Sequence, residues 1–432
     1  MAEIRPFRAW RYSERFSDNI EALTSPLFDV VSGKQRRVLY QNPLNSIHLS
    51  VPEKGPDVAA GILEKWKVDE IIKQDSLPGI YVYYQYFKMS GSPKTLCRKG
   101  FICYIRVYDW DDKDSQILRH ENTIPKAVND RIELLEKTEL NVSPTHGLYT
   151  DKDYELEKYM DEAITNPLLD TEDYQGVRDV LAVIHDAKVI RKFIDVIAQK
   201  TIILADGHHR YEGSLIYKKQ KALSPSHTGN EGYNFHMMYL TNTEAGDFRI
   251  LPTHRLINGI KNFNELLFTK RLDEFFTVKP VEDAHTLNEV ITGSPWTFGV
   301  LFKDAAYKIK LRPEAFIRMT WPFPDHIKAL DLTVLHYFVI ERILGIPGKD
   351  QRRSENISFD RSFPDCMAKV IRGEVQMALI TQEVSIDDIV QVCKSGYTMP
   401  QKSTYFYPKV VCGFVFGSIR QNEFQAPPYS PF

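Results

Sequence analysis

Runs of β-branched and aromatic residues alternate along this chain with segments of helical periodicity. Five such runs predict strands, at 80–87, 101–108, 180–185, 201–205 and 235–241. In 125–140 and 187–199, apolar residues recur at i, i+4 and i+7, which predicts helices with one apolar face. The order strand, helix, strand, helix from 180 to 222 predicts a crossover unit on a mixed sheet.

The second half of the chain mixes the two periodicities. The segment 332–346 predicts a helix, and the apolar segment 410–419 predicts a strand. We therefore expect an α/β (α+β) fold, with a mixed-sheet core over 1–245 and a smaller α+β C-terminal part over 246–432.

Composition excludes several classes of function. The 55 basic and 57 acidic residues give a net charge of -2, and no basic stretch marks a nucleic-acid partner. The five cysteines are dispersed without a C-x-x-C pair, which argues against a zinc knuckle or a disulfide scaffold. No run has the apolar length of a signal peptide or a membrane span. We expect a cytoplasmic protein with no nucleic-acid or membrane partner; a homodimer stays open.

The most informative stretch is 201–213, TIILADGHHRYEG. The predicted strand stops at Asp206-Gly207, and His208, His209 and Arg210 open a helical pattern. Free backbone N–H groups and the helix dipole favour an anion at such a turn, and a phosphoryl group is the obvious guest. A simpler alternative is that Asp206 only caps the helix.

Two further segments carry candidate chemistry. Glu121, after His120, precedes a predicted helix, where it is either a base that accepts a substrate hydroxyl proton or an exposed helix-entry acid. Segment 399–409 holds many hydrogen-bond donors and predicts a second anion-facing loop or a polar loop before a strand; its donors are Lys402, Ser403, Thr404, Tyr405, Tyr407 and Lys409. Arg255, in Thr253-His254-Arg255, either spreads transition-state charge or forms a surface ion pair.

The Asp-Gly-His-His-Arg turn and the earlier His-Glu pair resemble the ParB/sulfiredoxin-like superfamily, and within it the free serine kinases. The resemblance implies that Glu121 activates the acceptor hydroxyl and that Asp206 assists transfer and positions Mg²⁺. It also implies that Gly207 through Arg210 cradle the nucleotide phosphates. Arg255, Lys402, Ser403 and Thr404 are expected to add phosphate contacts, and His120 and Tyr405 to contact the acceptor.

Four longer blocks are similar to signature blocks of the DUF1015 family: 120–149, 205–212, 250–257 and 399–409. One departure is visible near the N-terminus. Where that family usually has Pro-Pro-Tyr-Asp-Val, this chain reads Ser25-Pro26-Leu27-Phe28-Asp29-Val30, so no role can be carried over for the Tyr hydroxyl.

These features predict a phosphotransferase that uses ATP or ADP with Mg²⁺ and phosphorylates a small hydroxyl metabolite, with free L-serine as the expected acceptor. Walker and G-x-G-x-x-G motifs are absent, so a P-loop or Rossmann site is not expected. Two alternatives remain: a nucleotide-binding switch of the ParB type and a sulfiredoxin-like reductase. The reductase would need a reactive cysteine at the turn, where this chain has Gly207-His208-His209 instead. A transition-metal site at His208 and His209 is disfavoured because adjacent side chains on one turn point apart.

Overall fold

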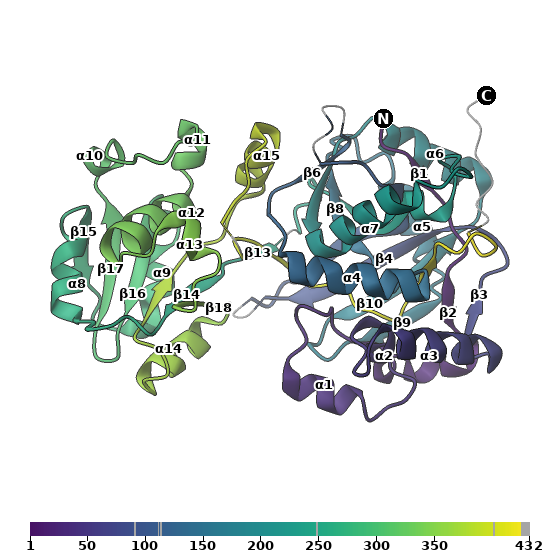
Figure 1. Ribbon diagram of the computed structural model, residues 1–432, viewed down its shortest axis with the longest axis horizontal. Coiled ribbons are helices and arrows are strands. Elements are labelled where there is room, and N and C mark those ends of the chain that lie inside the picture. Colours follow the sequence, from purple (N-terminus) through teal and green to yellow (C-terminus); the bar gives the residue numbers. More distant parts are fainter. Residues whose placement is uncertain (90–91, 111, 113–114, 248, 401, 425–432) are drawn as a thin grey trace. The chain divides into compact units, whose positions relative to one another are not determined.

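The computed structural model describes residues 1–432 apart from 90–91, 111, 113–114, 248, 401 and 425–432. The chain forms two compact units (Figure 1). The first comprises 1–119, 123–248 and 408–432, and the second comprises 120–122 and 249–407. The expected division into 1–245 and 246–432 assumed two consecutive blocks, whereas the chain returns to the first unit at Pro408.

The first unit is built on a nine-stranded mixed sheet in the order β6-β11-β8-β12-β5-β4-β10-β9, with β1 paired to β5. Its strands are β1 (Ile4–Arg5), β4 (Ile80–Lys88), β5 (Thr95–Arg106), β6 (Ile117–Arg119), β8 (Thr145–Tyr149), β9 (Leu169–Glu172), β10 (Arg178–Ile184), β11 (Ile202–Asp206) and β12 (Phe235–Asn242). Two short pairs lie outside it, β2 (Trp10–Tyr12) with β3 (Ile72–Gln74) and β7 (Leu140–Asn141) with β21 (Gly417–Ser418).

Side chains on the central strands alternate between two separate cores. On β4, Tyr81 and Tyr83 belong to one core and Ile80, Val82 and Tyr84 to the other. The period of two directs neighbours to opposite faces of a sheet. Because both faces are covered, the strands are apolar along nearly their whole length, and this composition makes them visible in the sequence.

Helices of the first unit divide between the two cores. The core of Ile80 and Val82 includes residues of α5 (Glu157–Ala163), α6 (Ala187–Ala198) and α7 (His208–Lys221). The core of Tyr81 and Tyr83 includes residues of the 3-10 helix η1 (Glu14–Ala22), α2 (Ile47–Ser50), α3 (Pro56–Val68) and the C-terminal segment. The remaining helices are α1 (Gly33–Leu39), α4 (Pro125–Thr138) and the short η2 (Gly232–Asn234).

The second unit has a six-stranded antiparallel sheet, β15-β17-β16-β19-β14-β18, and a separate pair of β13 with β20. Its strands are β13 (Arg249–Leu251), β14 (His254–Ile257), β15 (Phe276–Pro280), β16 (Thr297–Leu301), β17 (Ala306–Leu311), β18 (Ile357–Asp360), β19 (Met377–Ile380) and β20 (Tyr405–Tyr407). Its helices are α8 (Glu265–Leu272), η3 (Ala284–Thr286), α9 (Leu287–Ile291), α10 (Pro313–Phe316), α11 (Asp325–Lys328), α12 (Asp331–Val334), η4 (Leu335–Ile343), α13 (Gly348–Gln351), α14 (Phe363–Ile371) and α15 (Ile386–Ser395).

The predicted α/β class with a mixed sheet is confirmed. The five predicted strands and the helices at 125–140 and 187–199 are present, with bounds within two residues of those expected except that β5 begins six residues earlier, at Thr95. The crossover from β10 through α6 to β11 is also present, although four strands separate β10 from β11 in the sheet. The expected helix at 332–346 is α12 followed by the π-helical η4.

The expected strand at 410–419 is wrong for most of its length. Only Gly417–Ser418 forms a strand, and isolated bridges join Ser25 to Cys412 and Trp10 to Phe416. Gly413, at a φ of 115°, interrupts the extended backbone. The residues around it are apolar because they are buried in the core of Tyr81 and Tyr83, not because they form a ladder.

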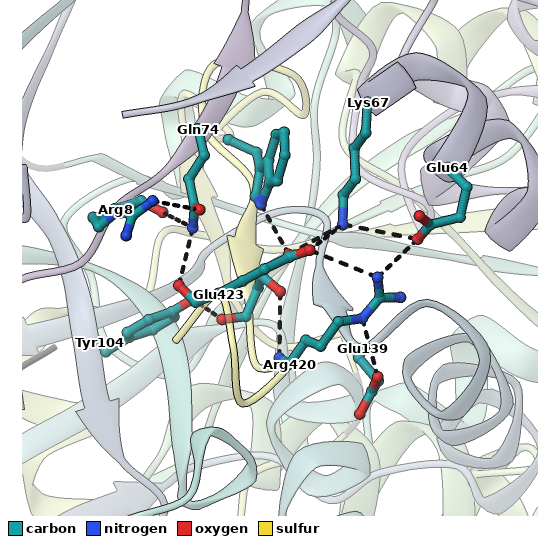
Figure 2. Close-up of polar contacts among 10 residues, drawn as sticks. Arg8, Glu64, Lys67, Gln74, Tyr104, Glu139, Arg420 and Glu423 are labelled. Atoms are coloured by element: carbon teal, nitrogen blue, oxygen red, sulfur yellow. Dashed lines mark hydrogen bonds and ion pairs between the residues drawn. The ribbon is translucent and has the colours of Figure 1, made fainter. Parts of the chain in front are cut away.

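A polar cluster around Glu423 anchors the returning segment (Figure 2). The Glu423 carboxylate accepts hydrogen bonds from Trp10 Nε1 at 2.9 Å and from Lys67 Nζ at 2.8 Å, and its backbone carbonyl accepts one from Gln74 Nε2 at 2.9 Å. Arg420 contacts Glu64 and Glu139. The last described residues are thus attached to β2, β3, α3 and the end of α4.

A buried carboxyl on β10 gives the fold a distinct pH response. Asp179 is fully buried, and Oδ1 accepts from Tyr83 Oη at 2.6 Å and Gln85 Nε2 at 2.9 Å. Burial raises the pKa of Asp179 to about 7, although these hydrogen bonds act to lower it. The folded protein therefore holds a proton there that the unfolded chain, with an ordinary Asp pKa, has released.

We expect the free energy of unfolding to fall as the pH rises from about 4 to 7, because the folded state binds the additional proton over that interval. Asp179→Asn should remove up to about 1.4 kcal/mol per pH unit from this slope. Urea unfolding at pH 5, 6 and 7 measures it. Asp170→Asn, which changes a more exposed carboxylate paired with Arg178, should leave the slope intact; equal slopes in wild type and Asp179→Asn would contradict the assignment.

Candidate functional site

The Asp206-Gly207 turn connects β11 to α7 and requires a glycine. Gly207 has a φ of 90°, and a Cβ atom there would lie 2.7 Å from Thr145 Cγ2 and 2.8 Å from Arg210 Nη2. Gly207 is the residue that precedes the helix, and no side chain caps it. Asp206 therefore does not cap α7, so the simpler alternative for this carboxylate is wrong, and the first N–H groups of α7 have no side-chain cap.

Asp206 is shared by two buried cations. Its Oδ2 accepts from Arg210 Nη2 at 3.0 Å, and its Oδ1 accepts from Lys409 Nζ in the returning segment. The three side chains are 12%, 8% and 9% exposed. Burial by itself raises the pKa of Asp206, but Lys409 and Arg210 outweigh it and hold that pKa well below its usual value. The trio keeps one net positive charge at the start of α7.

Arg210 has other bonds that fix its orientation. Nη1 donates to Ser143 Oγ at 2.8 Å and to the Pro144 carbonyl at 2.7 Å. The guanidinium therefore holds the 143–144 turn and Asp206 together. These contacts show that Arg210 positions its neighbours, and its expected place in the phosphate cradle stays a prediction.

The two adjacent histidines have different surroundings. His208 is buried, while His209 is partly exposed and its Nε2 accepts the backbone N–H of Ile124 at 3.0 Å. Thr123 Oγ1 donates to Glu212 on the second turn of α7. The chain just before α4 is thereby fixed to the first two turns of α7.

The residues present do not fit a magnesium ion held by Asp206. Both of its oxygens accept hydrogen bonds from cations, and in the described parts of the chain no three His, Cys, Asp or Glu side chains gather as a metal site. A cation at this carboxylate would face Lys409 and Arg210, which carry the same sign of charge.

Glu121 lies in the second unit with several of the residues that the sequence singled out. One of its carboxylate oxygens accepts from the Ser403 backbone N–H at 3.2 Å and from Thr404 Oγ1 at 3.4 Å. The buried His120 places Nε2 2.8 Å from Thr404 Oγ1. The His-Glu pair and the 399–409 block, 282 positions apart at their Glu121–Ser403 contact, thus form one cluster.

The other members of the 399–409 block have different settings. Lys402 is exposed and has a φ of 55°, so its backbone forms the bend that presents the Ser403 N–H. Tyr405 is buried on β20, and the Arg361 guanidinium lies 3.6 Å from its ring centroid. These settings do not identify a ligand for the side chain of Lys402 or of Tyr405.

Arg255 is fully buried on β14, so the alternative of a surface ion pair is wrong. Its Nε donates to His336 Nε2 at 3.2 Å, and Nη1 donates to the Thr253 carbonyl. Burial lowers the pKa of Arg255 to about 9, and the charge of Glu121 acts in the opposite direction. Arg255 and Glu121 are therefore electrostatic neighbours within the second unit.

Sequence reasoning missed His336, which orients Arg255. Its Nδ1 lies 2.7 Å from Gln351 Oε1, and burial, assisted by Arg255, lowers its pKa to about 3. The ring is therefore neutral, with the proton on Nδ1 and a lone pair on Nε2 toward Arg255. A single histidine inside the apolar segment 332–346 was the available signal.

A cavity of about 230 Å³ in the second unit includes Asn122, the residue after Glu121, in its wall. Other wall residues are Trp321, Phe323, His336, Phe359 and Met399. Asn122 Nδ2 donates to Thr398 Oγ1 at 2.6 Å, which fixes the edge of the cavity. The wall combines three aromatic side chains with several polar ones, a mixture found in small-molecule sites.

With this geometry in place, the comparisons with known proteins identify the family. A family model described as "Protein of unknown function (DUF1015)" matches residues 4–333. The chain belongs to the DUF1015 family. The resemblance inferred from the sequence blocks is thereby confirmed.

Solved structures with a detectable likeness to this DUF1015 protein include a free serine kinase in complex with AMP, at 12% identity and a TM-score of 0.37, covering 75% of this chain and 93% of that one. A conserved hypothetical protein from Pyrococcus furiosus gives 13% and 0.36, covering 74% and 95%. SbnI with a C-terminal truncation, from Staphylococcus aureus, gives 13% and 0.35, covering 72% and 85%. No curated protein matches the chain.

Two further observations concern this DUF1015 member. Phe28, at the position of the family's usual Tyr, has the Arg131 guanidinium 4.3 Å from its ring centroid, so a cation–π contact stands where a hydroxyl is expected. Across the described residues, no helix has the length and apolar character needed to cross a bilayer.

The shared carboxylate makes a testable contribution to stability in the DUF1015 chain. Lys409→Met should lower the free energy of unfolding by about 3 kcal/mol, the order expected when one partner of a buried ion pair is removed. Urea unfolding at pH 7 measures the loss. Lys219→Met, which removes an exposed lysine of α7 paired with Asp109, should cost less than about 1 kcal/mol.

Adding Asp206→Asn to Lys409→Met separates charge from packing. Because Asn leaves no uncompensated carboxylate, the double variant should lose less than the sum of the two single losses. Strictly additive losses would show that Lys409 and Asp206 are not energetically coupled.

Proposed function

We propose that this protein is a nucleotide-dependent phosphotransferase that phosphorylates a small hydroxyl metabolite, with free L-serine as the first acceptor to test. The observation that carries the proposal is the net positive trio of Asp206, Arg210 and Lys409 at the start of α7. Phosphoryl transfer depends mainly on positioning and on stabilisation of negative charge. Buried cations at the start of a helix, where the helix dipole also favours negative charge, suit the phosphates of a nucleotide.

In this proposal the first unit supplies phosphate binding. The N–H groups at Gly207, His208 and His209 contact the phosphates, and Lys409 supplies a positive charge held in place by Asp206. Arg210 holds Asp206 and the 143–144 turn in place. Asp206 therefore acts by orienting Lys409 and not as a metal ligand; Mg²⁺ enters as part of the nucleotide substrate.

The second unit supplies the base. Glu121 accepts the acceptor's hydroxyl proton, while the Ser403 N–H and Thr404 Oγ1 orient its carboxylate. Arg255 is an electrostatic neighbour of Glu121 in the same unit. Thr123 and Ile124, which follow Glu121 in the sequence, belong to the first unit and are bonded to the first turns of α7.

The cavity beside Asn122 bears on the acceptor. We assign to it the part of the acceptor that does not react. The aromatic part of its wall contributes little to binding a side chain as small as that of serine, so hydroxyl compounds with an aliphatic or aryl group belong in the test panel beside L-serine.

Phosphorus NMR tests the reaction directly. The protein is incubated with Mg²⁺, with ATP or ADP in separate tubes, and with the panel of hydroxyl compounds. A new phosphomonoester should form with the wild type. Glu121→Gln should reduce its rate by at least about 100-fold while nucleotide binding is retained, because only the base is lost. Asp206→Asn should weaken nucleotide binding itself, because Lys409 loses the carboxylate that orients it.

Glu133→Gln is the matched control, since Glu133 is an exposed carboxylate on α4 to which no catalytic or binding role is assigned; it should retain wild-type turnover. Unchanged turnover in Glu121→Gln would reject the role of the base. Nucleotide binding without any phosphomonoester would reject the transferase and favour the nucleotide-binding switch.

A further inference from the structure

The first unit contains a small cavity of about 40 Å³, separate from the cavity of the second unit. Its walls come from α4, from 140–143, from α7 and from β12, and include Arg131, Asn141, Ser143, Arg210, Ser214 and His236. A single water occupies roughly 10–15 Å³ on this measure. The cavity therefore accommodates one small ion or a few waters, and it excludes a nucleotide or a metabolite.

Three of these wall residues carry a buried nitrogen without a hydrogen-bond partner among the described residues: Arg210 Nε, Asn141 Nδ2 and His236 Nε2. The residues are 8%, 6% and 2% exposed. A buried donor left unsatisfied destabilises the folded state. Three such groups around one cavity indicate an occupant that accepts several hydrogen bonds.

The charge of the wall favours an anion. Among the described residues that line the cavity there are two arginines and no carboxylate. Arg131 is paired with Asp130, but Arg210 shares Asp206 with Lys409. Arg210 is therefore only partly compensated, and its unpartnered Nε–H is the charge-bearing donor of the cavity.

His236 fits the same occupant as a neutral ring. Burial, with a contribution from Arg210, lowers its pKa to about 3. Its Nδ1 lies 2.8 Å from Ser214 Oγ. When the serine hydroxyl donates to Nδ1, the ring proton is on Nε2, and all three unpartnered nitrogens are donors.

We propose that this cavity binds one small monovalent anion, chloride in particular, through the N–H groups of Arg210, Asn141 and His236. Waters can also accept these donors, but they carry no charge to compensate Arg210, whereas a single halide accepts all three and supplies a negative charge. Because Arg210 also bonds Asp206, the anion fixes the guanidinium from a second edge and keeps it oriented toward the carboxylate. The proposal does not depend on the phosphotransferase reaction.

Crystals of the wild-type protein grown without chloride and soaked in sodium bromide provide the direct test. Anomalous diffraction at the bromine edge should give a peak inside the cavity, within hydrogen-bond reach of Arg210 Nε and Asn141 Nδ2. Bromide peaks confined to the protein surface, with only water in the cavity, would overturn the proposal. This measurement needs no variant.

A solution experiment gives the matched comparison. The wild-type Tm should rise and saturate as sodium chloride replaces sodium glutamate at constant ionic strength, because the anion binds the folded state. Asn141→Asp introduces a carboxylate beside Arg210, so the saturable rise should disappear; Asn166→Asp, at an exposed loop position, should retain it. A wild-type Tm that is the same in both salts would reject anion binding in solution.

Discussion

The contact between Asp206 and its two cations is the constraint on which the organisation of the first unit depends. Arg210 comes from the first turn of α7, and Lys409 comes from a segment 203 positions after Asp206. Gly207 is needed because any side chain there would meet Thr145 and Arg210. The turn, the helix start and the returning segment are thus determined together, and a change in one alters the electrostatics of the others.

The large sheet provides the frame for this contact. Its alternating side chains fill two cores, one covered by α5, α6 and α7 and the other by N-terminal helices and the returning C-terminal segment. The same return that brings Lys409 to Asp206 therefore also closes a core. Gln85 joins these roles: its Nε2 donates to Asp179 within the sheet and to the Lys409 carbonyl at 3.1 Å. A buried proton on Asp179 and the orientation of Lys409 are in this way parts of one network.

Local patterns predicted the elements well because both faces of the sheet are buried, so strands appear as continuous apolar runs and helices as one-sided ones. The same rule failed at 410–419, where burial without a ladder produced an equally apolar run. Long-range contacts were harder to predict. Sequence reasoning noted Lys409 as a donor but could not pair it with Asp206, and it did not foresee that Arg210 holds the 143–144 turn. No local pattern distinguished a buried Arg255 from an exposed one. Sequence reasoning singled out His120, Glu121, Ser403 and Thr404 because they lie in family blocks. Their spacing along the chain did not indicate that they form one cluster.

The late position of Lys409 has a consequence for how the protein is made. Ribosomes deliver a chain from its N-terminus, so β11 and α7 are synthesised about two hundred residues before their second cation. Until then Asp206 and Arg210 form a neutral pair, and the net positive charge that we assign to phosphate binding does not exist. The nascent protein therefore acquires this charge only when the residues after Tyr407 have been added and have folded back onto the sheet. Synthesis order alone thus keeps incomplete chains from presenting the finished charge cluster.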